Sequence, residues 1–230
     1  MEPQDVLNAI REEDIHFPET GLICMENALS NGTVVPLARM KEIYDIAKKH
    51  NIPVHLDGAR LFNAAAALDV DAAQITQYTD SVMFCLSKGM CAPVGSMLAG
   101  SRQFIDRARK NRKLLGGGMR QAGILAAAGL IALEKMSKRL HIDHDNAKYM
   151  AKRLMDINGI KLTLEDIHIN MVFFDMEETG VSSDKLVKEL FDKGIKINGI
   201  EGGLMRYVTN NDVTKEDIDY TIQCMKNIMK

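Results

Sequence analysis

Short apolar runs alternate with longer amphipathic stretches over the first hundred residues, the pattern of β-strands joined by helices. Four runs predict strands of one sheet, the last of them glycine-flanked and antiparallel to the others: 21–25, 53–57, 81–86 and 95–100. Apolar residues recur at helical spacing over 37–51, and a crossover helix begins at 64–68. The first half of the chain therefore predicts an α/β domain with a mostly parallel sheet and helices on both faces.

The chain changes character after a long apolar helix predicted over 121–136. That helix is apolar on every side from 124 to 133, so it is expected to be buried and to bridge two domains. Beyond it, strands are predicted at 171–175, 196–197 and 204–208, and helices at 183–193 and after a capping box formed by Thr214 and Asp217. This βαββα order predicts a small α+β domain over 137–230, following the α/β domain over 1–136.

One lysine follows a predicted strand directly. The run 81–86 stops at Ser87-Lys88-Gly89, which places Lys88 at the carboxyl end of a buried strand, where open α/β sheets bind ligands. Burial there would lower the pKa of the amine and favour Schiff-base chemistry. The preceding strand ends on Asp57, one crossover unit upstream, with Arg60 just beyond it. A lysine plus a carboxylate that keeps a pyridine nitrogen protonated is what pyridoxal phosphate chemistry requires, although either residue alone is more often surface or turn.

Two short clusters resemble metal ligands. His55 and Asp57 form a His-x-Asp pair, but two ligands without a third are weak support for a metal. Residues 141–145 read His-Ile-Asp-His-Asp on a highly charged helix, and they are expected to form an exposed face of it. No metal is predicted.

Three longer blocks carry a family resemblance: HLDGARLFNAAAAL, DSVMFCLSKGMCAPVGS and RKLLGGGMRQAGILAAAG. They resemble the low-specificity L-threonine aldolases of the aspartate-aminotransferase superfamily, the pyridoxal-phosphate enzymes of fold type I. The resemblance runs from about Asp14 to the C-terminus. It implies a partial fold type I large domain followed by a small domain, the cofactor pyridoxal 5'-phosphate, and cleavage of L-threonine and L-allo-threonine to glycine and acetaldehyde.

The resemblance also assigns roles by position. Lys88 would be the lysine that binds the cofactor covalently, Asp57 the partner of the pyridine nitrogen, and Arg60 a contact for substrate carboxylate or cofactor. Arg206, in LMRYVTNNDVT, resembles the second carboxylate-binding arginine of the family.

Three further positions follow from the same comparison. His16, in DIHFP, is a candidate for the base that takes the β-hydroxyl proton. Lys113 and Arg120 flank the triple glycine of a loop that approaches the cofactor, expected to do so across a dimer interface. The link 28–36 departs from the family, because Ala28 and Leu29 replace a Thr-His pair, and this affects the expected substrate preference.

Members of the family are longer at the N-terminus, and the phosphate-binding Gly-Thr turn would precede Met1. The chain is thus expected to need a homo-oligomer, or association with a chain that supplies the N-terminal part. Both edges of its sheet are then expected to be bare. Two alternatives stay open: another fold type I lyase that catalyses β-elimination, or a truncated chain without activity.

Composition bears on nucleic-acid binding, membrane insertion and cellular compartment. The 29 basic and 31 acidic residues nearly cancel, which gives no electrostatic case for nucleic acid. No apolar run approaches the roughly 18 residues that span a membrane. The four cysteines lack CxxC spacing and suit a reducing, cytoplasmic setting. The expected partner is a small amino-acid substrate.

Overall fold

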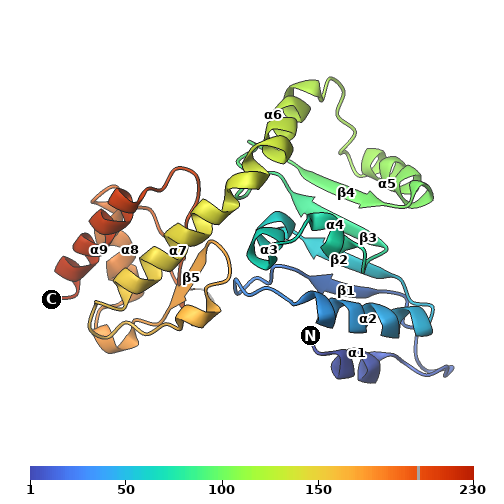
Figure 1. The fold of residues 1–230 in the computed structure, drawn as a ribbon, viewed down its shortest axis with the longest axis horizontal. Helices are drawn as coiled ribbons and strands as arrows, with labels where there is room; N and C mark the ends of the chain where they lie inside the picture. Colours follow the sequence, from blue (N-terminus) through green and yellow to red (C-terminus); the bar gives the residue numbers. More distant parts are fainter. Residues whose placement is uncertain (201–202) are drawn as a thin grey trace. The chain divides into compact units, whose positions relative to one another are not determined.

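The computed structural model describes residues 1–200 and 203–230, which form two compact units (Figure 1). The first unit comprises Met1–Leu29 and Val34–Lys138. The second comprises Arg139–Lys230 together with a four-residue loop tip, Ser30–Thr33. The main division of the chain therefore follows Lys138.

A four-stranded sheet forms the centre of the first unit. Its strands are β1 (Ile23–Glu26), β2 (Val54–Gly58), β3 (Ser81–Cys85) and β4 (Ser96–Gly100), in the spatial order β1-β2-β3-β4. The first three strands are parallel, and β4 runs antiparallel to β3. The mostly parallel α/β sheet predicted from the sequence is confirmed, including the antiparallel fourth strand.

The two faces of this sheet differ in burial. Val54 and Leu56 on β2 are fully buried, whereas Asp57 between the buried positions is exposed. The helices that connect the strands are α2 (Leu37–Lys49), α3 (Leu61–Leu68) and α4 (Ala72–Thr76), and each buries apolar side chains. Because successive side chains of a strand point to opposite faces, one face of β2 is packed and the other carries exposed polar groups.

Each outer strand of the sheet has one free edge. Within the residues described, β1 pairs only with β2, and β4 pairs only with β3. Every residue of β4 is exposed. The bare edges expected from the sequence are present, and unpaired backbone groups of this kind favour association with another chain.

The helices after the sheet are less buried than predicted. Helix α5 (Arg102–Leu114) buries no residue, and α6 (Gly123–Glu134) buries only Gly129 and Ala132. The prediction that 124–133 is buried all round was wrong: Ile124 is 83% exposed. An apolar helix surface is expected to pack against other residues, but within the first unit most of the α6 surface packs against nothing. Among the described residues, no helix is long and apolar enough to cross a membrane.

The second unit packs three helices with a two-stranded sheet. Strands β5 (Met171–Phe174) and β6 (Met205–Val208) pair antiparallel, and the helices are α7 (Leu140–Leu154), α8 (Ser183–Phe191) and α9 (Lys215–Ile228). Short 3-10 turns lie at Leu164–Asp166 and Glu177–Thr179, and a further one, Met136–Arg139, spans the division between the units. The predicted capping box is confirmed at the start of α9, where Thr214 and Asp217 bond reciprocally. The predicted strand at 196–197 was wrong, because Lys196 is exposed and this short stretch forms no strand.

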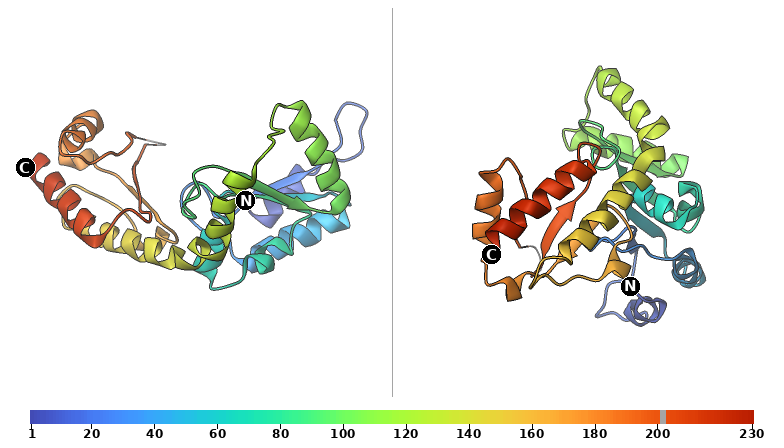
Figure 2. Two further views of the ribbon diagram at one scale, coloured as in Figure 1. Left: turned by 90° about the horizontal axis from the view of Figure 1, so that it is seen from above. Right: turned by 60° about the vertical axis from the view of Figure 1, so that its left-hand side comes forward.

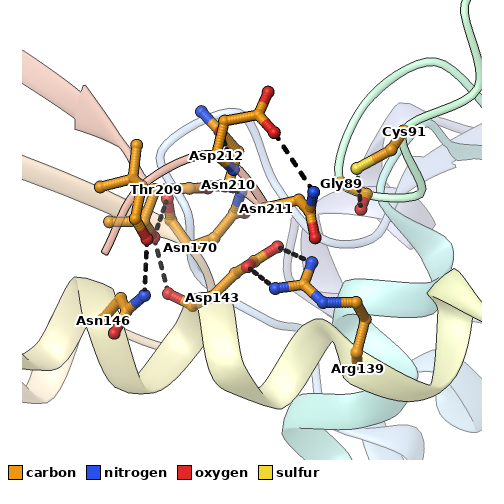
Figure 3. A network of polar contacts seen from close by, with 11 residues as sticks. Gly89, Cys91, Arg139, Asp143, Asn146, Asn170, Thr209, Asn210, Asn211 and Asp212 are labelled. Atoms are coloured by element: carbon orange, nitrogen blue, oxygen red, sulfur yellow. Dashed lines mark hydrogen bonds and ion pairs between the residues drawn. The ribbon is translucent and has the colours of Figure 1, made fainter. Parts of the chain in front are cut away.

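Helix α7 contains buried polar groups that the charge pattern concealed. Asp143 is fully buried, and its Oδ1 accepts a hydrogen bond of 3.0 Å from Nη2 of Arg139 (Figure 3). The hydroxyl of Thr209 donates to the backbone carbonyl of Asp143 at 2.6 Å, and His144 is also buried. The expectation that 141–145 forms an exposed face was therefore wrong for these two residues. The 3.6-residue period turns them into the unit while His141 and Asp145 face outward.

Burial of His144 predicts a pH-dependent stability. Desolvation lowers its pKa from 6.5 to about 4, so the folded chain keeps this ring neutral where the unfolded chain protonates it. Stability from this group is complete above pH 6.5 and falls as the pH drops toward 4, by up to about 3 kcal/mol. Urea unfolding at pH 7 and pH 5 measures the loss. His144→Gln should reduce this loss of stability between pH 7 and pH 5, whereas the same substitution at exposed His141 should leave most of it. An equal loss in the two variants would contradict the prediction.

Candidate active site

The carboxyl ends of two neighbouring parallel strands carry the predicted pair. Strands β2 and β3 are in register at Asp57 and Met83. Asp57 lies on the exposed side of β2, and its Oδ1 accepts a hydrogen bond of 3.0 Å from the backbone N–H of Ala59. This bond turns the chain from the strand toward α3, which begins directly after Arg60.

The segment after β3 is held in a tight loop by backbone hydrogen bonds. The N–H of Leu86 donates to Gly95 O at 2.9 Å, and the N–H of Ala92 donates back to Leu86 O at 3.0 Å. Within this loop, Cys91 N–H donates to Lys88 O at 2.9 Å, with Cys91 in the left-handed region at a φ of 61°. The loop fixes the backbone of Lys88 at the sheet edge, but its side chain is exposed. The expectation that this lysine is buried was wrong for the chain by itself.

Lys88 and Arg60 line one cleft. Its walls are the turn after β2 and the loop after β3: Ala59, Arg60, Leu61, Phe62, Asn63, Cys85, Lys88, Gly89 and Met90. Phe62 and Phe84 pack edge-to-face beside it, with ring centroids 5.4 Å apart. Lys88 and Arg60 therefore share this small cleft of about 10 Å³, whereas Asp57, the predicted partner of Lys88, is not among the residues that line it.

Two members of this cleft were missed by sequence reasoning. Asn63 is buried in the first turn of α3, and Cys85 is the last residue of β3. The signal for Asn63 was a polar residue inside an otherwise apolar helix start. The signal for Cys85 was its place three residues before Lys88.

The remaining predicted residues lie elsewhere in their units. His16 is exposed in the loop after α1 (Pro3–Ala9), where its Nδ1 lies 2.8 Å from Asp14 Oδ1; hydrogen bonds from the His16 backbone and ring hold the pKa of that carboxyl below its usual range. Lys113 lies in the last turn of α5 and Arg120 in the following loop, both exposed. None of these three lines the cleft of Lys88.

Arg206 belongs to the second unit. It lies on β6 opposite Phe173 on β5, with its guanidinium 6.0 Å from the Phe173 ring centroid. It lines a pocket of about 550 Å³ whose wall also includes Asn198 and Asn210. A guanidinium beside amide groups suits a small carboxylate.

A buried asparagine shapes the loop that departs from the family resemblance. Asn27 follows β1 and is fully buried; its Nδ2 donates to Val35 O at 3.0 Å and its Oδ1 accepts from Val35 N–H at 3.1 Å. The Asn27 N–H donates to Asp57 O at 3.1 Å. The Asn27 side chain thus closes the loop 28–34, and its backbone N–H connects the end of β1 to the strand that carries Asp57.

Solved structures of other proteins share the fold of this chain. The fold is shared with solved structures of a Leishmania major threonine aldolase (TM-score 0.78, 18% identity, 100% of this chain and 68% of that one) and a Sphingomonas wittichii serine palmitoyltransferase (TM-score 0.72, 17% identity, 99% and 58%). These likenesses show that the chain shares the fold of these pyridoxal-phosphate-type structures over most of its length and covers about two thirds or less of each of them.

The sequence defines the family. The beta-eliminating lyase family matches residues 1–177, and the chain belongs to it. A low-specificity L-threonine aldolase of Arabidopsis thaliana is 40% identical over 234 residues, covering all of this chain and 65% of the relative. The low specificity L-threonine aldolase of Escherichia coli K12 is 42% identical over 209 residues, covering 91% of this chain and 60% of that protein. The chain thus spans less than two thirds of these relatives.

Proposed function

We propose that this chain is the lysine-bearing part of a pyridoxal-phosphate-dependent aldolase that cleaves L-threonine and L-allo-threonine to glycine and acetaldehyde. The observation that carries the proposal is the cleft in which Lys88 and Arg60 meet at the carboxyl ends of β2 and β3. The names of the Arabidopsis and Escherichia coli relatives, at 40% and 42% identity, support the substrate class.

The residues present fit the two reactive ends of the cofactor. Lys88 offers an amine on a fixed backbone loop, and Asp57 offers a carboxylate on the exposed face of the adjacent strand, where it would hold the ring nitrogen protonated. Lys113 and Arg120 would bind the phosphate as exposed cations on either side of the triple glycine. The chemistry that pyridoxal phosphate supplies when bound is withdrawal of electrons from the bonds at the amino-acid Cα.

The protein's own residues would orient the amino acid and move its protons. Arg60 and Arg206 would bind the substrate carboxylate, each as a fork of N–H donors. His16 would accept the proton of the β-hydroxyl, which lets the Cα–Cβ bond break and acetaldehyde leave. A proton delivered to Cα then completes glycine.

The proposal also covers the assembly of the chain, the roles of its two domains and its cellular compartment. The chain would work as a homo-oligomer or with a second polypeptide that supplies the N-terminal segment of the family, and residues 1–136 would form the C-terminal part of the cofactor-binding domain, with 137–230 as the small domain. We place it in the cytoplasm, in glycine formation from threonine. Among the described residues, Cys24, Cys85, Cys91 and Cys224 form no disulfide.

Cofactor titration and a substrate panel test the proposal. The chain is mixed with pyridoxal phosphate, with and without a polypeptide of the N-terminal family segment, and visible absorbance is recorded. Acetaldehyde is then assayed with L-threonine and L-allo-threonine, and elimination products with L-cysteine. We expect weak or no binding alone, tight binding with the added polypeptide, and acetaldehyde from both threonines.

Each other outcome rejects a defined part of the proposal. Strong colour and turnover in the isolated chain would show that it needs no partner. Products from L-cysteine without acetaldehyde would favour the β-eliminating alternative. A colourless mixture under all conditions would support a non-catalytic chain.

A further inference from the structure

A cavity of about 640 Å³ lies in the second unit, beside strand β5. Its walls come from three parts of the chain that are distant in sequence: the loop tip 30–33, residues within 161–167, and the residues 173–174 with Leu204. All of them belong to the second unit, and none of these lining residues is part of the cleft of Lys88. Pockets for small molecules have volumes of roughly 300–1,000 Å³ and mix apolar walls with a few polar groups. We call this space the β5 cavity.

Strand β5 turns one aromatic ring away from the apolar core of the unit. Helices α7 and α9 lie side by side (Figure 2), and both pack with Val172 and Phe174 in one apolar cluster. Because side chains alternate along a strand, Phe173 points to the opposite face, where it is half-buried and lines the β5 cavity. The cavity therefore has an aromatic ring in its wall that the core does not use.

The loop tip is fixed closely against this sheet. Gly32 has a φ of +87°, and a Cβ added there would lie only 3.2 Å from Cβ of Met171, so a side chain at this position would crowd β5. Beside it, Oδ1 of Asn31 accepts hydrogen bonds from the backbone N–H of Thr33 at 3.1 Å and from the Thr33 hydroxyl at 2.7 Å. Since the Thr33 hydroxyl proton is committed to Asn31, the Thr33 oxygen offers only lone pairs to a ligand.

The charges around the β5 cavity are mostly negative. The segment 161–179 contains a single lysine, Lys161, and five acids: Glu165, Asp166, Asp175, Glu177 and Glu178. Lys161 lines the cavity but forms an ion pair with Glu178, and this carboxylate, followed by Asp175 and Glu177, raises the pKa of the lysine. Asp166 also lines the cavity and is exposed. The wall thus presents a carboxylate that the lysine of this segment does not neutralise.

We propose that the β5 cavity binds a protonated primary amine that carries an aromatic ring. The ammonium group donates to the Asp166 carboxylate, with the Thr33 oxygen as a further acceptor in the same wall. The ring of the ligand packs on Phe173 and Leu204. The Arg206 guanidinium lies 6.0 Å from the Phe173 ring centroid and lines a different pocket, so the positive end of the ligand lies at Asp166 and not over this ring. This site goes beyond the proposed function and needs no cofactor.

Four probes that share a phenyl ring separate charge from shape. Phenethylamine is a cation, phenethyl alcohol is neutral, L-phenylalanine is a zwitterion and 3-phenylpropionate is an anion at pH 7. Each is titrated into the full chain without cofactor, and backbone amide shifts in two-dimensional NMR spectra locate the probe and give its dissociation constant. The site is identified by shifts centred on 30–33, 161–167 and 173–174.

Two substitutions, each with a matched control, test the two parts of the site. Asp166→Asn removes the charge, and Glu165→Gln alters a neighbouring exposed acid that does not line the cavity. Phe173→Leu removes the ring, and Phe191→Leu makes the same change at an exposed position of α8. Circular dichroism verifies that all four variants fold.

Phenethylamine should bind at these residues at least about tenfold more tightly than phenethyl alcohol. Asp166→Asn should remove this preference and Glu165→Gln should keep it, whereas Phe173→Leu should weaken both probes alike and Phe191→Leu neither. Absence of shifts at these residues would overturn the proposal, as would equal binding of amine and alcohol. Tighter binding of 3-phenylpropionate or L-phenylalanine than of the amine would overturn it in favour of a carboxylate ligand. Cofactor colour, read on separate samples, reports on the proposed chemistry, so either proposal can fail alone.

Discussion

Replacing Lys88 with alanine is expected to abolish covalent attachment of pyridoxal phosphate and to lower threonine cleavage by roughly three orders of magnitude or more. The reason is geometric. Lys88 is the amine that the loop after β3 holds in the cleft it shares with Arg60. The chain carries other exposed lysines, such as Lys188, but they do not line this cleft at the turn into α3.

Chemical trapping measures the attachment directly. The chain is incubated with the cofactor and the N-terminal polypeptide, reduced with borohydride, digested, and mapped by mass spectrometry. The label should lie on the peptide that contains Lys88 and disappear in Lys88→Ala, whereas Lys188→Ala, a change at an exposed lysine of α8, should keep label and activity. A label on a different lysine, or undiminished acetaldehyde formation by Lys88→Ala, would refute the assignment.

The parts of this fold that were predictable from sequence are those set by local pattern. Three apolar runs separated by helical segments specify a parallel sheet, because parallel strands need crossover connections. The same rule predicts that Asp57 and Lys88 follow neighbouring strands at one end of the sheet, since the carboxyl ends of parallel strands lie together. Thr214 and Asp217 predicted the start of α9 through the chemistry of capping.

The wrong predictions concern which residues are buried, because burial depends on residues far away in the sequence. The apolar helix α6 was predicted as buried, yet composition cannot say whether the surface that covers it belongs to the same unit. Lys88 is exposed for a related reason: its cleft is walled by two short segments, and nothing described in the first unit closes over it. Asp143 was expected on a surface because its helix is charged, but Arg139 one turn earlier pairs with it and allows its burial.

The first unit leaves much of its surface uncovered. The free edges of β1 and β4, which the sequence predicts, lie beside the exposed α6 and Lys88, for which burial was expected, and unpaired edges and exposed apolar surface of this kind favour association. The second unit differs, because its helices and β5 enclose a continuous apolar cluster that includes Leu154, Phe174 and Leu190. We therefore expect the second unit to withstand denaturant by itself and the first to depend on association.

Phe174→Ala is expected to lower the free energy of unfolding by about 3–5 kcal/mol, which is the largest stability effect we predict. Phe174 lies on β5, is 1% exposed, and stacks on Tyr207 of β6 with ring centroids 5.4 Å apart and planes 13° apart. Removing its ring leaves a cavity between the sheet and the helices α7, α8 and α9, and the rigid strand backbone limits how far the neighbours can close it.

Phe191→Ala is the matched control, because this phenylalanine ends α8 and is 64% exposed. Urea unfolding of the full chain, followed by far-ultraviolet circular dichroism, should show a transition at lower urea concentration in Phe174→Ala. In Phe191→Ala the free energy of unfolding should change by less than about 1 kcal/mol. If the stability of the second unit resides in the apolar cluster around β5, only the buried ring matters. Similar losses in the two variants would mean that the ring on β5 adds nothing to the packing of that cluster.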